Sequence, residues 1–543
     1  MKTFNISGNL VDILAKTIYP ATIQVTDGKI SQITRDAQQY NHYILPGFTD
    51  AHVHVESSML IPSEFARLAV VHGTIATVSD PHEIANVMGV KGVDFMLKNG
   101  KQVPFRFCFG APSCVPATTF ETAGATINAA EVAQLLQRPE IGYLSEMMNF
   151  PGVLNHDPEV IAKIEAAKAA GKPVDGHAPG LRGPAAKAYA DAGISTDHEC
   201  FTLDEALEKI NYNMHILIRE GSAARNFEAL YPLLNDYADK VMFCSDDKHP
   251  DSLVEGHINV LVRRAVAKGI DVFHALKAAC INPVLHYKLS NGLLNINDAA
   301  DFIVVDDLRQ FNVLATYIDG VKVAENGNSL IQSVDVAPVN NFTAEEVVAE
   351  DFVVHAEKSK DTLATIKVIE AIDGELITNA ISATVPVTDG IIQNDPDNDI
   401  LKLVVVNRYN PAPVAVAFIK GFGLKEGAIA SSVAHDSHNI IAVGTTDENI
   451  AAAVNAVIKE QGGVSVVTPL TTQVLPLPVA GLMSNLDGYT VAQQYSNLDH
   501  AAKALGSKLG APFMTLSFMA LLVIPHLKLS DLGLFDGDKF QLL

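Results

Sequence analysis

The feature that most constrains this sequence is a regular alternation of short apolar runs and amphipathic segments over residues 45–294. Segment 157–172 predicts one of the helices, with Asp157 as N-cap, Pro158 at the first helical position and Gly171 beyond the end. The apolar runs that predict strands include 74–80, 141–148, 173–177 and 241–247. Repeated strand–helix units predict a (β/α)8 barrel, and a doubly wound sheet with similar alternation is the alternative.

Two β-rich pieces flank this region, and a further domain follows it. Asp-Gly turns between alternating apolar residues begin at Asp27 and at Asp319, which predicts a hairpin in each piece. We therefore expect residues 1–44 and 295–335 to form one small split β-domain. Residues 336–543 restart the pattern and predict a separate C-terminal α/β or α+β domain.

Composition limits the class of protein and its partners. The chain has 543 residues, 48% of them hydrophobic, which allows several buried cores. No apolar stretch approaches the roughly 18 residues of a membrane span, so the apolar segment 513–524 is expected to be a buried element. A formal charge of −23 disfavours nucleic acid as a partner, because the surface would repel a polyanion.

The cysteines and the first residues bear on the compartment. The start of the chain shows polar residues where an export signal needs an apolar run, and the five cysteines show no CxxC spacing. We therefore expect a cytoplasmic protein with reduced thiols and no thiolate zinc site.

The string "LPGFTDAHVHVESSM" contains the strongest local motif. His52 and His54 are two residues apart, so in an extended strand both side chains lie on the same side, where they can share one metal ion. A lone pair of this kind is more often structural. The preceding Pro-Gly and the following Glu56 instead favour a strand end at a functional rim.

Further metal-competent residues follow the later apolar runs. Glu146 lies in "YLSEMM", His177 in "VDGHAPG", His198 in "STDHE" and Asp246 in "CSDDKHP". Each alone is more readily explained as a structural residue. Because the loops after barrel strands gather at one end of the barrel, their joint occurrence predicts a metal site there. Glu199 follows His198 directly and is expected on the opposite face of the strand.

These motifs, together with "SDPHEIANV", resemble the amidohydrolase superfamily and, within it, the bacterial adenine deaminases. The resemblance extends over the whole chain. It implies two divalent metal ions, with manganese expected and iron or zinc as alternatives. It assigns their ligands as His52 and His54 with Asp246 for the first, His177 and His198 for the second, and Glu146 between the two. Glu146 stands where many relatives carry a carbamylated lysine.

The same resemblance implies hydrolytic deamination of adenine to hypoxanthine and ammonia by a metal-activated hydroxide, in purine salvage or adenine catabolism. The free base is the expected substrate, and a homodimer or higher homo-oligomer is expected. Asp246 would handle the proton of the attacking water. Glu56 or Glu83 would carry a proton to the ring, although Glu83 also suits a purely structural helix N-terminus. Expected substrate-binding residues are Ser57, Ser58, Asp80 and His82.

Two other functions stay open at this point. One is a different amidohydrolase that acts on a cyclic amide or an N-acyl group, and the other is a non-catalytic protein that binds a metal or a purine. The zinc nucleobase deaminases are excluded, because His54-Val55-Glu56 matches their H-x-E but no P-C-x-x-C follows. The polar segment around His435 and His438 is interpreted as a turn, with a ligand-binding loop over the barrel as the alternative.

Overall fold

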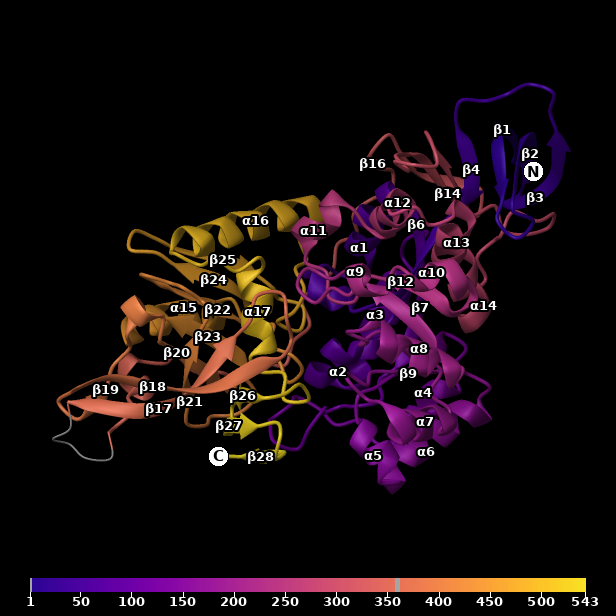
Figure 1. Ribbon diagram of the computed structural model, residues 1–543. Helices are drawn as coiled ribbons and strands as arrows, with labels where there is room; N and C mark the ends of the chain where they lie inside the picture. The colour runs from indigo at the N-terminus through magenta and orange to yellow at the C-terminus, as the bar shows by residue number, and fades with distance from the viewer. Residues whose placement is uncertain (1, 357–361) are drawn as a thin grey trace.

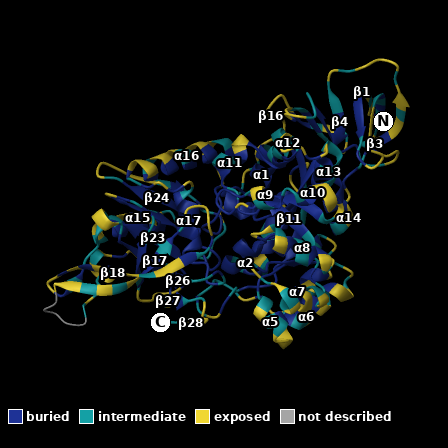
Figure 2. Ribbon diagram, viewed as in Figure 1, coloured by how far each residue is buried: buried dark blue, intermediate teal, exposed yellow. Residues whose placement is uncertain are grey.

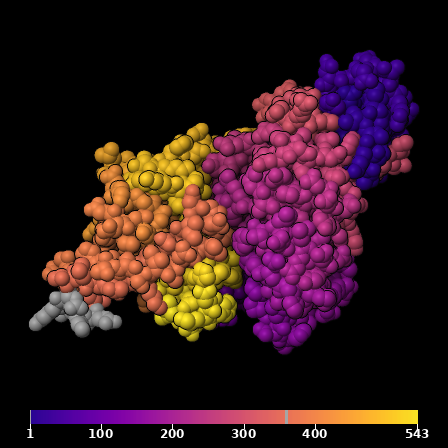
Figure 3. All heavy atoms as spheres, in the orientation of Figure 1, coloured from indigo at the N-terminus to yellow at the C-terminus, as the bar shows by residue number. Residues whose placement is uncertain are grey.

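The computed structural model describes residues 2–356 and 362–543, and it shows three parts in a row (Figure 1). A β-domain that contains the N-terminus lies at one end, a barrel lies in the middle, and a C-terminal domain lies at the other end. The two larger parts form separate masses that meet along one broad face (Figure 3). Buried residues continue across this contact, while exposed residues lie mainly on outer helices and loops (Figure 2).

Parallel strands form the middle part. The strands are β5 (Phe48–Val53), β6 (Thr74–Ser79), β7 (Arg106–Ala111), β8 (Ile141–Met147), β9 (Val174–Gly176), β10 (Thr196–Asp197), β11 (His215–Arg219) and β12 (Val241–Cys244). They pair in chain order as two parallel sheets, β5 to β9 and β10 to β12. Ser195 donates to Val174 O between the two sheets, and a parallel bridge joins Val53 to Asp246. The ring closes in this way, and the predicted (β/α)8 barrel is confirmed.

Helices connect the strands and cover the outside of the barrel. They are α1 (Pro62–Ala69), α2 (His82–Met88), α3 (Val90–Gly100), α4 (Ala129–Leu136), α5 (Phe150–Leu154), α6 (Pro158–Ala169), α7 (Gly183–Asp191), α8 (Leu203–Asn211), α9 (Phe227–Leu230), α10 (Leu233–Asp236), α11 (Pro250–Glu255), α12 (Ile258–Ala267), α13 (Val272–Leu276) and α14 (Asn282–Tyr287). The prediction for α6 is confirmed, since Asp157 accepts a hydrogen bond from Glu159 N at 2.8 Å and caps the helix.

The N-terminal β-domain is one sheet made from both flanking pieces. Its strands are β1 (Thr3–Asp12), β2 (Thr17–Thr26), β3 (Lys29–Arg35), β4 (Tyr43–Pro46), β13 (Phe302–Val305), β14 (Val313–Ile318), β15 (Val321–Glu325) and β16 (Asn328–Ser329). β4 lies between β1 and β13, so it joins the two pieces. The turns at Asp27 and Asp319 take positive φ, as tight hairpin turns require.

The C-terminal domain is built on a larger mixed sheet with the order β19-β18-β17-β21-β20-β23-β22-β24-β25. These strands are β17 (Leu363–Ala371), β18 (Thr378–Thr388), β19 (Ile391–Ile392), β20 (Leu401–Val406), β21 (Ala415–Lys420), β22 (Ala428–Ser431), β23 (Ile440–Gly444), β24 (Gly463–Val467) and β25 (Thr472–Pro476). The remaining elements are α15 (Asp447–Lys459), α16 (Gly488–Ala504), α17 (Pro512–Phe518), β26 (Leu527–Ser530), β27 (Gly533–Asp536) and β28 (Gln541–Leu542). α17 and the β22–β23 connection lie on the side of the C-terminal domain that faces the barrel.

The C-terminal domain packs on the barrel face where the strands end. A hydrophobic core cluster runs without a break from barrel residues such as Phe65 to Leu516 and Phe518 of α17. Asn341 donates to Val87 O at 3.1 Å, and Asp531 accepts from Thr122 N at 2.8 Å. This shared core holds the domain over the barrel mouth.

The apolar segment 513–524 is buried inside the C-terminal domain, as expected, where it forms most of α17 and the turns after it. In the described part of the chain, no helix combines the length and the apolar composition that crossing a bilayer requires.

Candidate metal centre and active site

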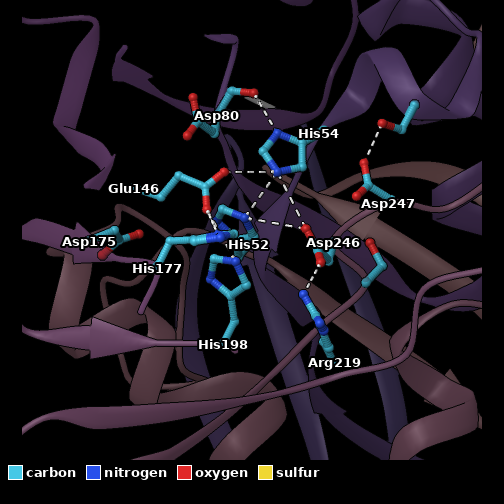
Figure 4. A network of polar contacts seen from close by, with 12 residues as sticks. His52, His54, Asp80, Glu146, Asp175, His177, His198, Arg219, Asp246 and Asp247 are labelled. Atoms are coloured by element: carbon cyan, nitrogen blue, oxygen red, sulfur yellow. Dashed lines mark hydrogen bonds and ion pairs between the residues drawn. The ribbon is translucent and has the colours of Figure 1, made fainter. Parts of the chain in front are cut away.

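Four imidazoles surround one carboxylate inside the mouth of the barrel (Figure 4). His54 Nε2 lies 3.3 Å from Glu146 Oε1, whereas His177 Nδ1 and His198 Nε2 lie 2.8 and 3.2 Å from Glu146 Oε2. His52 completes the set, with its Nε2 atom 3.2 Å from His54 Nε2. The two oxygens of Glu146 therefore face different histidines, as a carboxylate between two cations would.

Asp246 lies on the other side of His52 and His54. Its Oδ1 atom is 3.5 and 3.3 Å from their Nε2 atoms, and Arg219 Nη1 donates to its Oδ2 atom at 2.8 Å. Asp246 adopts φ +55°, and backbone hydrogen bonds to β5 hold it there. Burial alone would raise the pKa of Asp246, but Arg219 and the two imidazoles hold it well below its usual range.

The donor atoms at this site fit divalent cations. Several sets of buried ligand atoms lie within 4.8 Å of one another, among them one from His52, His54 and Asp246 and one from His52, Glu146 and His198. The Nε2 atoms of His52 and His54 face each other, and a shared cation satisfies both nitrogens better than a hydrogen bond between them would. His177 offers an additional buried nitrogen, Nε2, that has no hydrogen-bond partner within the described residues.

The loop after β6 adds a second polar layer. His82 Nδ1 lies 3.2 Å from Asp80 Oδ2 and 3.5 Å from Glu146 Oε1, so both predicted residues border the carboxylate. Glu83 lies in the first turn of α2 and contacts His438, and its Oε1 atom lies 3.5 Å from His82 Nε2. Burial opposes the charge on Glu83, but the three histidines around it, led by His435, keep its pKa well below the ordinary value.

The three residues predicted after β5 make different contacts. Ser57 Oγ donates to Asp247 Oδ1 at 2.5 Å, so Ser57 lies beside the pocket wall. Ser58 Oγ donates to Val55 O instead. Glu56 accepts from Ile84 N at 3.2 Å, so it supports the start of α2, and burial raises its pKa to about 7.

Two sequence interpretations are wrong. Glu199 does not face away from His198, because its Oε1 atom lies 3.5 Å from His198 Nε2 and Arg219 binds both carboxylate oxygens. The segment with His435 and His438 is not a simple polar turn, since both rings reach Glu83 in the barrel.

The site also contains residues that the sequence interpretation did not select. They are Arg219, Glu199, Asp247, His435 and Asp436, and all five line the same pocket. Sequence signals were present for Asp247 and Glu199, which directly follow the predicted ligands in "SDD" and "DHE", and for His435 and Asp436, which lie in the polar segment interpreted as a turn.

Both the barrel and the C-terminal domain line the pocket. The barrel supplies mainly polar groups, which are His54, His82, Glu83, Glu146, His177, His198, Glu199, Arg219, Asp246 and Asp247, together with Met148. The C-terminal domain supplies the apolar side chains Leu376, Phe518 and Leu521 as well as His435 and Asp436. Such a mixed lining suits a small molecule that has both polar and apolar surface.

Comparison with known proteins agrees with this geometry. Residues 43–323 match the amidohydrolase family model, and residues 375–541 match the model of the adenine deaminase C-terminal domain. A protein named adenine deaminase from Salinibacter ruber is 56% identical over 99% of this chain and 98% of its own length. The chain belongs to the adenine deaminase family.

Other members of the family are similar over the same span. The adenine deaminase of Sulfurovum sp. is 56% identical over 98% of this chain and 98% of its own, and that of Methanosarcina acetivorans is 54% identical over 98% of each chain. The resemblance drawn from the motifs is thereby confirmed, and it includes the C-terminal domain.

Proposed function

We propose that this chain catalyses the hydrolytic deamination of adenine to hypoxanthine and ammonia. The observation that carries the proposal is the full-length similarity to proteins named adenine deaminase, which includes the domain that covers the barrel mouth. The buried cluster of imidazoles and carboxylates supports a hydrolytic reaction, and the mixed polar and apolar lining of the pocket suits a small heterocycle.

We assign two divalent cations to the centre, with manganese expected and iron or zinc as alternatives. His52, His54 and Asp246 would hold the first, His177 and His198 the second, with Glu146 between them. A divalent cation in such a site lowers the pKa of water to about 7 and so supplies a nucleophile at neutral pH.

Asp246 is placed to take a proton. Its Oδ2 atom is fixed by Arg219, and its Oδ1 atom remains turned toward the histidines. Its pKa is held well below the usual range, so the group is ionised at neutral pH and accepts the proton of the attacking water at Oδ1.

Glu83 is better placed than Glu56 to carry a proton to the ring. Glu83 lines the pocket and is ionised, so it can take a proton and return it to a ring nitrogen of the substrate. Glu56 bonds the backbone of Ile84 and holds the loop that carries Glu83. The apolar groups of the C-terminal domain exclude water from the opposite face of the base.

We also propose that the protein works in the cytoplasm as a homo-oligomer. The five cysteines are free in the structure, which suits a reducing compartment.

The direct test is turnover of adenine after reconstitution with manganese and, separately, with iron. Release of ammonia and hypoxanthine is expected, together with little or no turnover of a panel of cyclic amides. No adenine turnover with either metal would refute the proposal, and turnover of a cyclic amide alone would identify a different amidohydrolase. The variant Asp246→Asn should keep its metal and lose about 10²- to 10⁴-fold in kcat.

A further inference from the structure

One residue of the C-terminal domain contacts two barrel loops at once. The connection between β22 and β23 enters the barrel mouth, and its His435 side chain is 5% exposed and lines the pocket. Nothing in the proposed reaction uses this residue. Its position is nevertheless fixed by polar atoms on each side of the ring.

The Nε2 atom of His435 lies between two carboxylates. It is 3.1 Å from Asp247 Oδ1 and 3.3 Å from Glu83 Oε1. Asp247 follows β12 and Glu83 follows β6, so the imidazole joins loops from separate parts of the barrel. Two buried carboxylates repel each other, and a single N–H shared by both holds them at a fixed spacing.

The surroundings of the opposite nitrogen are compatible with an N–H on Nε2, which the two carboxylates require. Ser517 Oγ accepts from His435 N at 3.3 Å and lies 2.8 Å from His435 Nδ1. Because the oxygen already accepts from the backbone, its own hydrogen is free to bond Nδ1. A neutral imidazole that accepts at Nδ1 carries its hydrogen on Nε2, where the carboxylates are.

The ring has little freedom to turn away from the two carboxylates. Phe518 packs edge-on against it, with centroids 5.1 Å apart and an interplanar angle of 76°. Both Ser517 and Phe518 belong to α17, whose residues Phe513, Met514 and Leu516 are buried in the core shared with the barrel. The helix therefore sets the direction of the His435 side chain.

We propose that His435 is a positioning residue that holds Glu83 and Asp247 at the spacing needed to accept the N–H groups of a planar nitrogen heterocycle. The inference rests on the proposed function and extends it, since it gives the C-terminal domain a part in substrate recognition. Both carboxylates only accept hydrogen bonds when ionised, so they match the N–H edge of a base. His435 acts through them and needs no contact with the substrate.

The test compares steady-state kinetics of the full chain, reconstituted with manganese, for the wild type, His435→Ala and His435→Gln. His526→Ala is the matched control, because His526 belongs to the same domain and pairs with Asp538 at the surface, 2.7 Å away. Loss of a hydrogen bond to charged groups should raise KM for adenine about tenfold or more in His435→Ala, with a smaller effect on kcat. His435→Gln, which keeps N–H donors, should recover part of that loss.

Metal content and the unfolding midpoint separate positioning from a general structural role. Metal content is expected to match the control in all variants, and the unfolding midpoint of His435→Ala is expected to stay above the assay temperature although it falls, because two buried carboxylates lose their shared donor. An unchanged KM in His435→Ala overturns the inference, and so does an equal loss of metal and of kcat in the Ala and Gln variants.

If His435→Ala does not fold, Ser517→Ala replaces it, because this change frees Nδ1 while the imidazole stays in place. A raised KM with normal metal content then supports the inference, and wild-type kinetics refute it. Absence of adenine turnover in the wild type is a separate result, which counts against the proposed function itself.

Discussion

Replacement of Arg219 by methionine is the sharpest test of the electrostatics of the site. The guanidinium is 3% exposed and bonds Asp246 at 2.8 Å and Glu199 at 3.0 Å. Methionine keeps most of the aliphatic volume but leaves both carboxylates buried without their cation. Breaking a buried ion pair in this way costs about 3–5 kcal/mol, which is a large part of a typical total stability of about 5–15 kcal/mol.

The measurement is urea unfolding of the metal-free protein, followed by circular dichroism, with the wild type and Arg264→Met run in parallel. Arg264 also pairs with two carboxylates, at 2.8 and 3.0 Å, but its side chain is 30% exposed, so its loss should cost about 1 kcal/mol or less. Added manganese should restore part of the stability of Arg219→Met, because a cation then faces Asp246 again. Equal midpoints for the two variants, at equal slopes, would refute the reasoning.

Three further outcomes are expected. Burial and the charge of Asp436 raise the pKa of Glu121 from 4.5 to about 8. Between these two pH values the folded protein keeps a proton that the unfolded chain loses, so the free energy of unfolding should fall as the pH rises from 4.5 to about 8. Glu121→Gln should flatten that fall, on the order of 4–5 kcal/mol at most, and an unchanged pH profile of unfolding would contradict this. Lys209 donates to Ala178 O at 2.7 Å and to Asp197 at 2.8 Å, and these two residues adjoin His177 and His198 in the sequence. Lys209→Met should therefore lower the metal content toward one ion per chain. Full metal content by elemental analysis would count against this prediction. Chelation should abolish turnover and lower the melting temperature, with recovery on adding manganese, and an unaffected melting curve would argue against a metal in this cluster.

Local rules predicted the parts of the molecule that depend on neighbouring residues. Strand alternation placed His52 and His54 together, and capping residues fixed the start of α6 at Pro158. The barrel followed from repeated strand–helix units. Each of these features is decided within one or two elements, which is the range over which sequence periodicity carries information.

The errors arose where tertiary structure decides the outcome. Glu199 was assigned to the far face by the two-residue period of a strand, but β10 ends at Asp197, so the period does not apply to it. Arg219 has no motif of its own, and the polar segment of His435 favoured a turn, because the roles of both residues depend on contacts with Asp246 and Glu83 that sequence periodicity does not reveal. The assignment of Ser58 to substrate binding stays a prediction, and its hydroxyl donates to Val55 O in the structure.

The split sheet has a consequence for how this protein is made. β4 needs β13 as its neighbour, and its partner residues in the pairing, Tyr43 and Val305, are separated by the entire barrel. While only the first strands have been synthesised, the edge of β4 that later pairs with β13 stays exposed. It remains so until the barrel sequence has also emerged from the ribosome. The N-terminal sheet is thus expected to be completed late during synthesis, and a chaperone that shields strand edges would act on this stretch of the nascent chain.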